Sequence, residues 1–275
     1  MGLGGVNASE EYQEVSKESL NKILSTLKER FTEGLYPNLD ERIDRINRLK
    51  NLVEDNMDAF HRALEKDFGT RHEQLSLLSD TMPVINNANH ALKNIRKWTK
   101  PEKRKPNFPL GLLGSKAYVQ SQPYGVVGII APWNFPLNLS LAPLVEIFAA
   151  GNNAMMKLSE FVPETSELTE KLINKYFKSD EVRVVNGGPK TSQFFSGLAF
   201  DHLLFTGSTA VGKKIASEAA TNLVPLTLEL GGKSPVVISS EAKMKKSVDK
   251  IIMGKLFNAG QICISPDYIF VPEDK

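Results

Sequence analysis

The sequence predicts an α/β fold built on a doubly wound parallel sheet, and two patterns support this prediction. From Gly125 onward, short apolar runs alternate with stretches of helical spacing. Strands and helices that alternate in this way form parallel strands joined by crossover helices. With 41% hydrophobic residues among 275, the chain also has enough apolar side chains for a buried core. In such a sheet, ligands bind at the carboxyl ends of the strands.

The expected elements follow from these patterns. The strands are the apolar runs 126–130, 154–157, 182–185, 202–205 and 226–230. The crossover helices lie near 139–150, 163–177, 190–196 and 211–220. Before the sheet, apolar residues recur at helical spacing over 20–31, 43–64 and 75–98, which predicts a helical layer packed on the sheet. Residues 1–15 are small and polar and are expected to form a loose tail.

A basic segment lies between this helical layer and the sheet. Residues 93–105 hold seven basic side chains and one acidic side chain. A nucleic-acid-binding patch is one interpretation. The solvated end of a helix followed by a linker explains the segment better, because cations are favourable at a helix C-terminus and no interleaved aromatic residues follow. The alternating run 116–122 then predicts a strand.

Charge and cysteine content limit the partners and the compartment. The formal net charge of +2 favours neither nucleic acid nor a membrane surface. The N-terminus lacks a basic region followed by an apolar one, and no apolar run approaches the roughly 18 residues of a membrane span. One cysteine indicates a reducing compartment or no redox constraint at all. We therefore expect a cytoplasmic protein.

Cys263 is the only cysteine in the chain. A lone thiol has too few partners for a disulfide or a thiolate metal site, so no metal is expected, and Cys263 is either a small buried residue or a nucleophile. Small and polar residues surround it in the segment 258–267. Taken alone, a core position is the simpler interpretation.

Glu229 is the carboxylate that could serve this thiol. It lies in the apolar run 226–230, where alternation places it on the face opposite Leu228 and Leu230. We expect it to be removed from water at this position, which suits a general base. A structural ion pair is the alternative.

Two motifs together resemble the aldehyde dehydrogenase superfamily. Residues 228–235 read Leu-Glu-Leu-Gly-Gly-Lys-Ser-Pro, and Cys263 follows Glu229 by 34 positions inside Gly-Gln-Ile-Cys. The resemblance implies that Cys263 is the nucleophile and Glu229 the general base for thioester hydrolysis. It also implies that Asn134, in a turn flanked by prolines after the first strand, donates a hydrogen bond in an oxyanion hole, and that Trp133 borders the cofactor pocket.

Other strand ends carry residues suited to a dinucleotide. The segment 206–212 opens a helix, and its glycines would let the backbone approach a phosphate. As a bare pattern this is weak, since Thr209 replaces the usual middle glycine and a plain strand-to-helix turn is the alternative. The resemblance assigns cofactor contacts to Lys157, Ser159, Glu160, Gly188, Gly207, Ser208, Val211, Gly212 and Leu230. Glu160 would repel a 2′-phosphate, which favours NAD over NADP.

The resemblance divides the chain into a tail (1–15), a Rossmann-like NAD-binding domain (16–231) with an oligomerisation arm near 108–124, and the start of an incomplete catalytic domain (232–275). Within this superfamily, the sequence is most similar to the coniferyl aldehyde dehydrogenase branch. It implies a homo-oligomer, a dimer at full length, that oxidises an aromatic or long-chain aldehyde to the acid through a cysteine thiohemiacetal and thioester. A truncated cofactor-binding module without turnover is the alternative, and NADP is the alternative cofactor.

Overall fold

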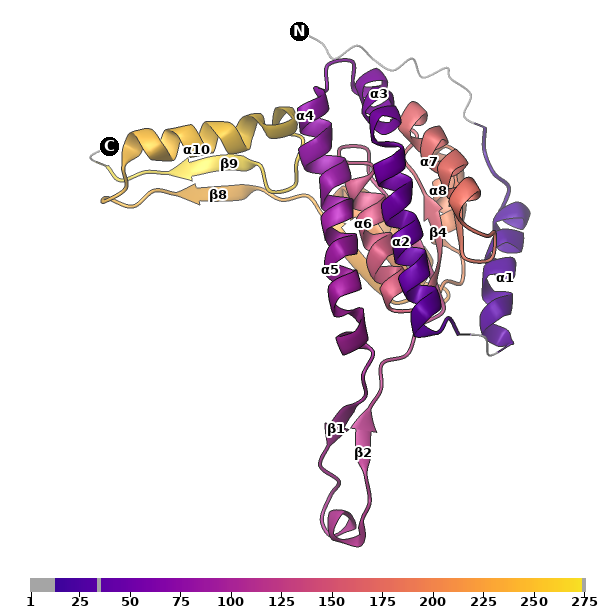
Figure 1. The fold of residues 1–275 in the computed structure, drawn as a ribbon. Helices are drawn as coiled ribbons and strands as arrows, with labels where there is room; N and C mark the ends of the chain where they lie inside the picture. The colour runs from indigo at the N-terminus through magenta and orange to yellow at the C-terminus, as the bar shows by residue number, and fades with distance from the viewer. Residues whose placement is uncertain (1–12, 34–35, 274–275) are drawn as a thin grey trace.

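A five-stranded parallel sheet forms the centre of the computed structural model, which describes residues 13–33 and 36–273 (Figure 1). Its order is β5-β4-β3-β6-β7, and every neighbouring pair is parallel. Because the chain winds outward from β3 in both directions, the sheet is doubly wound and the predicted fold class is confirmed. The strands are β3 (Val126–Ile130), β4 (Asn153–Lys157), β5 (Val182–Val185), β6 (His202–Gly207) and β7 (Leu226–Leu230).

Helices cover both faces of the sheet, which explains the apolar runs. All five residues of β3 are buried, and its side chains alternate between two hydrophobic clusters. Strands covered on both faces are apolar throughout. One cluster packs against α2 (Leu39–Asp55), α3 (Met57–Phe68), α5 (Met82–Trp98), α6 (Asn138–Ala149) and α7 (Pro163–Tyr176). The other packs against α1 (Lys17–Thr32), α8 (Pro189–Ser196) and α9 (Thr209–Ala220).

The N-terminal helical layer differs in detail from the prediction. The stretch 43–64 belongs to two helices, α2 and α3, because the backbone leaves helical geometry at Asn56 and the Nδ2 of that residue donates to the carbonyl of Leu52. The third stretch begins with α4 (Glu73–Ser76) and passes through a π-helix, η1 (Leu77–Thr81), before α5.

The predicted loose tail is wrong where the structure describes it, and residues 1–12 lie outside the described residues. The carboxylate of Glu14 accepts hydrogen bonds from the backbone N–H groups of Lys190 and Thr191 at the start of α8. The backbone N–H of Val15 donates to the Thr191 hydroxyl at 2.8 Å. Residues 14 and 15 are therefore fastened to the domain.

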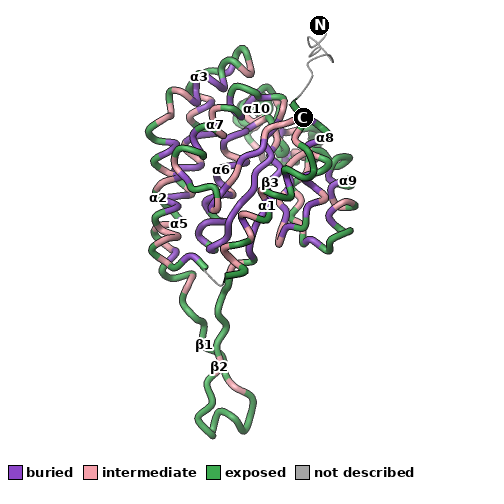
Figure 2. Tube along the Cα trace, turned by 90° about the vertical axis from the view of Figure 1, so that its right-hand side faces the viewer, coloured by how far each residue is buried: buried purple, intermediate pink, exposed green. Residues whose placement is uncertain are grey.

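A hairpin projects from the body of the molecule (Figures 1 and 2). Its strands β1 (Glu102–Arg104) and β2 (Ala117–Val119) are antiparallel, and a 3₁₀ turn, η2 (Leu110–Leu113), lies at the tip. The alternating run 116–122 correctly predicted β2, whereas β1 falls in the segment interpreted as a linker. The tip exposes apolar side chains, including Phe108, which is 86% exposed.

The last part of the described chain forms a second, smaller unit. Strands β8 (Ser234–Val237) and β9 (Pro266–Phe270) pair in parallel, and α10 (Met244–Leu256) connects them. Figure 1 shows this unit extending away from the five-stranded sheet. Along 13–33 and 36–273, no helix combines the length and the apolar character that crossing a membrane requires.

A buried ion-pair cluster joins α2 to the edge of the sheet. Glu181, immediately before β5, accepts from Nε of Arg45 at 3.2 Å and from Nη1 of Arg48 at 2.9 Å. Burial alone would raise the pKa of Glu181, but the hydrogen bonds and charges of the two arginines and the Lys178 backbone N–H lower that pKa from 4.5 to about 2. A carboxylate whose pKa is lowered by folding stabilises the protein above its unfolded pKa.

We expect Glu181→Gln to destabilise the protein by about 3 kcal/mol at pH 7, because a pKa lowered from 4.5 to about 2 corresponds to that free energy. The difference from the wild type should shrink as the pH falls from 4.5 toward 2, where the wild-type carboxyl group is itself protonated. Urea unfolding at several pH values measures it. Glu54→Gln, in an exposed pair with Lys50, is the control and should cost little. A Glu181→Gln penalty that is independent of pH would contradict the assignment.

Candidate active site

A cleft of about 710 Å³ lies at the carboxyl ends of β3, β6 and β7. It is lined by residues from four segments that the sequence analysis singled out. From the predicted site it brings together Trp133, Asn134, Gly207, Ser208, Glu229, Leu230 and Cys263. All three candidate catalytic residues therefore face one space.

The turn 131–136, after β3, presents Asn134 to the cleft. Its backbone carbonyl accepts hydrogen bonds from Nη1 of Arg71 at 2.9 Å and from Nδ2 of Asn258 at 3.1 Å. Its side-chain Nδ2 donates to the carbonyl of Gln261 at 2.9 Å. An amide nitrogen carries two hydrogens, so one remains for a further acceptor.

The segment before Cys263 has an unusual backbone. Asn258, Ala259 and Gly260, in the short helical turn η3 (Phe257–Gly260), have φ values of 49°, 54° and 79°. Left-handed geometry is costly for residues other than glycine and persists where the surroundings fix it. The buried Asn258 side chain supplies that constraint, because it donates to both Asn134 and Gln261. The turn leaves Cys263 exposed, so the core interpretation of this thiol is wrong.

Glu229 differs from the expectation in its burial. The alternation along β7 is confirmed, since Leu228 and Leu230 are half-buried and Glu229 lies on the other face. That face is exposed, because no described element covers Glu229 there. The predicted removal of this carboxylate from water is therefore wrong for the described residues.

The turn from β6 into α9 has glycines where the packing requires them. A Cβ on Gly207 would lie 2.5 Å from the Phe205 ring, and one on Gly212 would lie 2.8 Å from Leu230 Cδ2. Gly212 thus lets α9 pack closely on β7. Ser208 caps the helix by accepting from the backbone N–H of Val211 at 3.3 Å. The first turn of α9, with its remaining N–H groups, begins beside the cleft.

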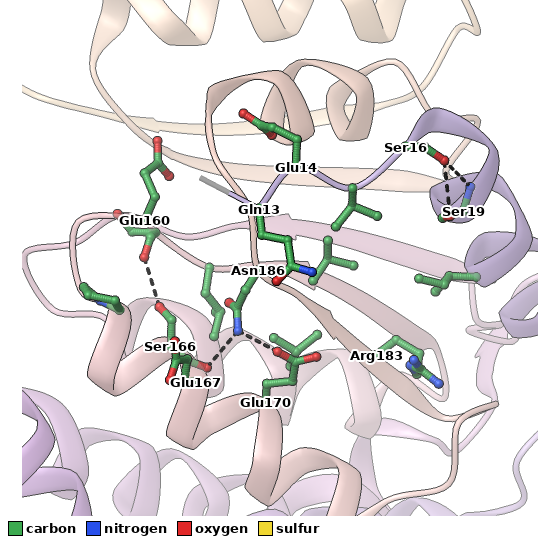
Figure 3. Close-up of a pocket in the computed structure, with 18 residues that line it drawn as sticks. Gln13, Glu14, Ser16, Ser19, Glu160, Ser166, Glu167, Glu170, Arg183 and Asn186 are labelled. Carbon is green, nitrogen blue, oxygen red and sulfur yellow. Dashed lines mark hydrogen bonds between the residues drawn. The ribbon is translucent and has the colours of Figure 1, made fainter. Parts of the chain in front are cut away.

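The end of β4 contributes to a second cleft of about 930 Å³, shown in Figure 3. Ser159 and Glu160 line it together with Glu14 and Asn186. Lys157 lies beneath, with a side chain only 1% exposed, and its Nζ contacts a Glu160 carboxylate oxygen at 3.0 Å. Burial lowers the pKa of Lys157, and the Glu160 charge opposes that shift. Lys157 and Glu160 therefore do not form a solvent-exposed ion pair.

Gly188 is buried and caps α8, and it lines neither cleft. Its neighbour Gly187 lines the second cleft, and a Cβ there would lie 2.5 Å from the Thr191 hydroxyl oxygen. Val211 is exposed on the first turn of α9 but lines neither cleft.

Sequence reasoning missed the residues that hold the site together. Asn258 and Gln261 were noted only as polar neighbours of the thiol. Arg71 and Asp80 form a buried ion pair behind the Asn134 turn. No sequence signal distinguished Asp80, because the same helical stretch also holds charged residues such as Lys93 and Arg96, which are exposed.

The sequence matches the model of the aldehyde dehydrogenase family over residues 7–275. The chain belongs to the aldehyde dehydrogenase family. Among curated relatives it is 47% identical, over 94% of its length, to the probable coniferyl aldehyde dehydrogenase of Caulobacter vibrioides. The resemblance found in the two sequence motifs is thus confirmed.

Solved structures of this family share the fold. The AldH of Staphylococcus aureus in a substrate-bound state matches 92% of this chain with a TM-score of 0.87 and 34% identity. The Mycobacterium tuberculosis aldehyde dehydrogenase complexed with NAD+ matches 95% with a TM-score of 0.84 and 26% identity. The chain spans about half the length of these aldehyde dehydrogenases: 53% of the Caulobacter relative, 55% of AldH and 53% of the Mycobacterium protein.

Proposed function

We propose that the protein oxidises an aldehyde to the carboxylic acid with NAD as the hydride acceptor. The observation that carries the proposal is the cleft that joins Asn134, Glu229 and Cys263 beside the start of α9. A cofactor-binding module without turnover would not require a thiol, an amide and a carboxylate in one space. Residues 16–231 would bind the cofactor, and 232–275 would belong to the catalytic domain.

The chemistry begins at Cys263. Its thiolate adds to the aldehyde carbon, and the carbonyl oxygen gains the negative charge of a thiohemiacetal. The free N–H of Asn134 and the backbone N–H of Cys263 donate to this oxygen. Each such donor stabilises the transition state by about 3 kcal/mol. After hydride has left the carbon, the product is a thioester on Cys263.

Glu229 completes the cycle. Its carboxylate takes a proton from water, the hydroxide adds to the thioester carbon, and the Cys263 thiolate leaves as the acid forms. The exposure of Glu229 supports this role, because water reaches it freely.

The residues around the two clefts fit NAD. The uncapped N–H groups of α9 suit a pyrophosphate, and Gly207 and Ser208 border the first cleft there. Bound NAD supplies the acceptor for hydride. Glu160, at the rim of the second cleft, would accept from ribose hydroxyls, with Lys157 holding its carboxylate in place. Among the remaining predicted contacts, Trp133 and Leu230 would border the nicotinamide end. Val211 and Gly212 would belong to the phosphate-binding turn, and Ser159 and Gly188 would shape the adenosine end.

Aromatic rings support a bulky aromatic aldehyde such as coniferyl aldehyde. Trp133, Phe135 and Phe257 line the catalytic cleft, and flat rings pack well against an aromatic substrate. The similarity to the Caulobacter relative points the same way.

The hairpin near 108–124 would serve as an oligomerisation arm in a homodimer, since its exposed apolar tip needs a partner surface. The exposed thiol fits a reducing compartment such as the cytoplasm. Tests of activity are best made on the protein at the full length that its gene encodes.

Cys263→Ser should abolish aldehyde oxidation and leave NAD affinity unchanged, because the hydroxyl is a far weaker nucleophile and the cofactor residues lie on other strand ends. Steady-state NADH formation measures the oxidation rate, and a fluorescence titration with NAD measures the cofactor affinity. Substantial turnover by this variant would remove Cys263 from its proposed role.

Glu229→Gln keeps the shape of the side chain and removes its basicity, so it should slow thioester hydrolysis by about 10²- to 10⁴-fold. The first turnover should survive as a burst of NADH in stopped-flow absorbance. Thr227→Ser, two residues earlier on the same face of β7, is the control. Loss of the burst with NAD still bound would mean that Glu229 acts before hydrolysis.

Glu160→Gln should shift the preference from NAD toward NADP by roughly tenfold, or 1.4 kcal/mol. The change removes repulsion of a 2′-phosphate and leaves the buried Lys157 cation without its neutralising partner. Titration with each dinucleotide gives the ratio of dissociation constants. Glu167→Gln, in the same cleft, should leave the ratio unchanged. An unchanged ratio in Glu160→Gln would assign the preference to another residue.

A further inference from the structure

A buried ion pair lies directly behind the Asn134 turn. Arg71, between α3 and α4, contacts Asp80 of η1 with 2.5 Å between Nη2 and Oδ2. The two side chains are 1% and 0% exposed, and neither lines the catalytic cleft. Burying two charges is costly unless their remaining hydrogen-bonding capacity is used. The groups that form the remaining hydrogen bonds with Arg71 and Asp80 therefore show which part of the chain the ion pair holds in place.

Those groups belong to both ends of one turn. Arg71 Nη1 donates to the Asn134 carbonyl at 2.9 Å. Asp80 Oδ1 accepts from the backbone N–H groups of Leu137 at 3.0 Å and Asn138 at 3.3 Å. These N–H groups open α6 and have no partner within that helix, and a carboxylate is favourable at this end. The pair thus holds the chain on either side of Phe135 and Pro136.

Packing leaves the arginine little freedom. Its guanidinium lies over the rings of Phe68, at 4.5 Å, and Phe135, at 5.3 Å. The Ser79 hydroxyl accepts from Arg71 Nη2 at 2.8 Å and donates to the Leu75 carbonyl at 2.7 Å, and its oxygen lies 3.2 Å from Asp80 Oδ2. Ser79 and Asp80 belong to the π-helix η1, a helical form that occurs often at functional sites.

Hydrogen bonds also connect the Asn134 turn to residues 258–263, which we call the nucleophile segment because it carries Cys263. The Asn134 carbonyl, held by Arg71, also accepts from Asn258, and the Asn134 side chain donates to Gln261, two residues before Cys263. A displacement of the Asn134 backbone would therefore move the amide donor and disturb the segment that carries the thiol.

We propose that Arg71 and Asp80 are positioning residues for aldehyde oxidation, which fix the Asn134 amide relative to Cys263. The inference rests on the proposed function. A lysine at position 71 keeps the charge but presents one ammonium group, which cannot reach Asn134, Ser79 and Asp80 in the geometry of a planar fork. Misplacement of a catalytic group by about 1 Å can cost 10²-fold in rate.

The test compares Arg71→Lys with Arg45→Lys in the protein at its full encoded length. Arg45 is a matched control, because its side chain is also 1% exposed, is paired with the buried Glu181 at 3.2 Å and lies over a Phe148 ring. We expect Arg71→Lys to lower kcat about 10- to 100-fold with unchanged affinity for NAD. Arg45→Lys should lower the melting temperature and leave kcat within about twofold of the wild type. If Arg71→Lys does not fold, Asp80→Asn, which keeps the shape and the Oδ1 acceptor, takes its place.

A double-mutant cycle with Asn134→Ala separates the inference from the proposed function. If Arg71 acts through Asn134, the double variant should be no slower than Asn134→Ala alone. If the two substitutions lower kcat by factors that multiply in the double variant, the positioning role is overturned. An Arg71→Lys variant that is less stable but has the wild-type kcat would also overturn it. Either result leaves the proposed function intact. An unchanged kcat in Asn134→Ala would overturn the oxyanion role itself, and the inference with it.

Discussion

Parallel pairing of β3, β6 and β7 is the constraint on which the site depends. The register sets Ile130 opposite Phe205, and Thr206 opposite Glu229, so the three strands end together. Neighbouring strands lie about 4.8 Å apart, so β3 and β7 are separated by about 10 Å. The proposed reaction places the aldehyde and a water molecule in the cleft between the Asn134 turn and Glu229. Residues almost a hundred positions apart meet because the strands share one direction.

Strand ends alone do not fix side chains to the tolerance that chemistry needs. Here the loops after the strands are fastened by buried polar groups: the Asn134 turn by Arg71 and Asp80, and the nucleophile segment by Asn258. Both arrangements cost free energy of folding. The Arg71–Asp80 pair buries two charges, and the nucleophile segment holds residues other than glycine in left-handed backbone geometry. Residues held at such a cost lie beside the cleft, which is where rigidity contributes to function.

The strands β3 and β4 could be predicted because a strand covered on both faces leaves an apolar run in the sequence. β7 could be predicted from its alternation, since only one of its faces is covered. The catalytic roles proposed for Cys263, Glu229 and Asn134 follow from the resemblance to the family, and they remain predictions. Asp80 and Asn258 could not be recognised as anchors, because their value lies in contacts with residues tens to more than a hundred positions away. The exposure of Glu229 was also beyond the sequence, since alternation defines a face of β7 but not what covers it.

The most direct test of the account is to find the covalent intermediate. The full-length protein would be mixed with coniferyl aldehyde and NAD, quenched in acid within one turnover, digested and examined by peptide mass spectrometry. We expect the acyl group of the aldehyde on the peptide that contains Cys263, only when NAD is present, and gone once substrate is exhausted. Formation of the acid with the Cys263 peptide unmodified at every time point would contradict the central claim that this thiol carries the reaction.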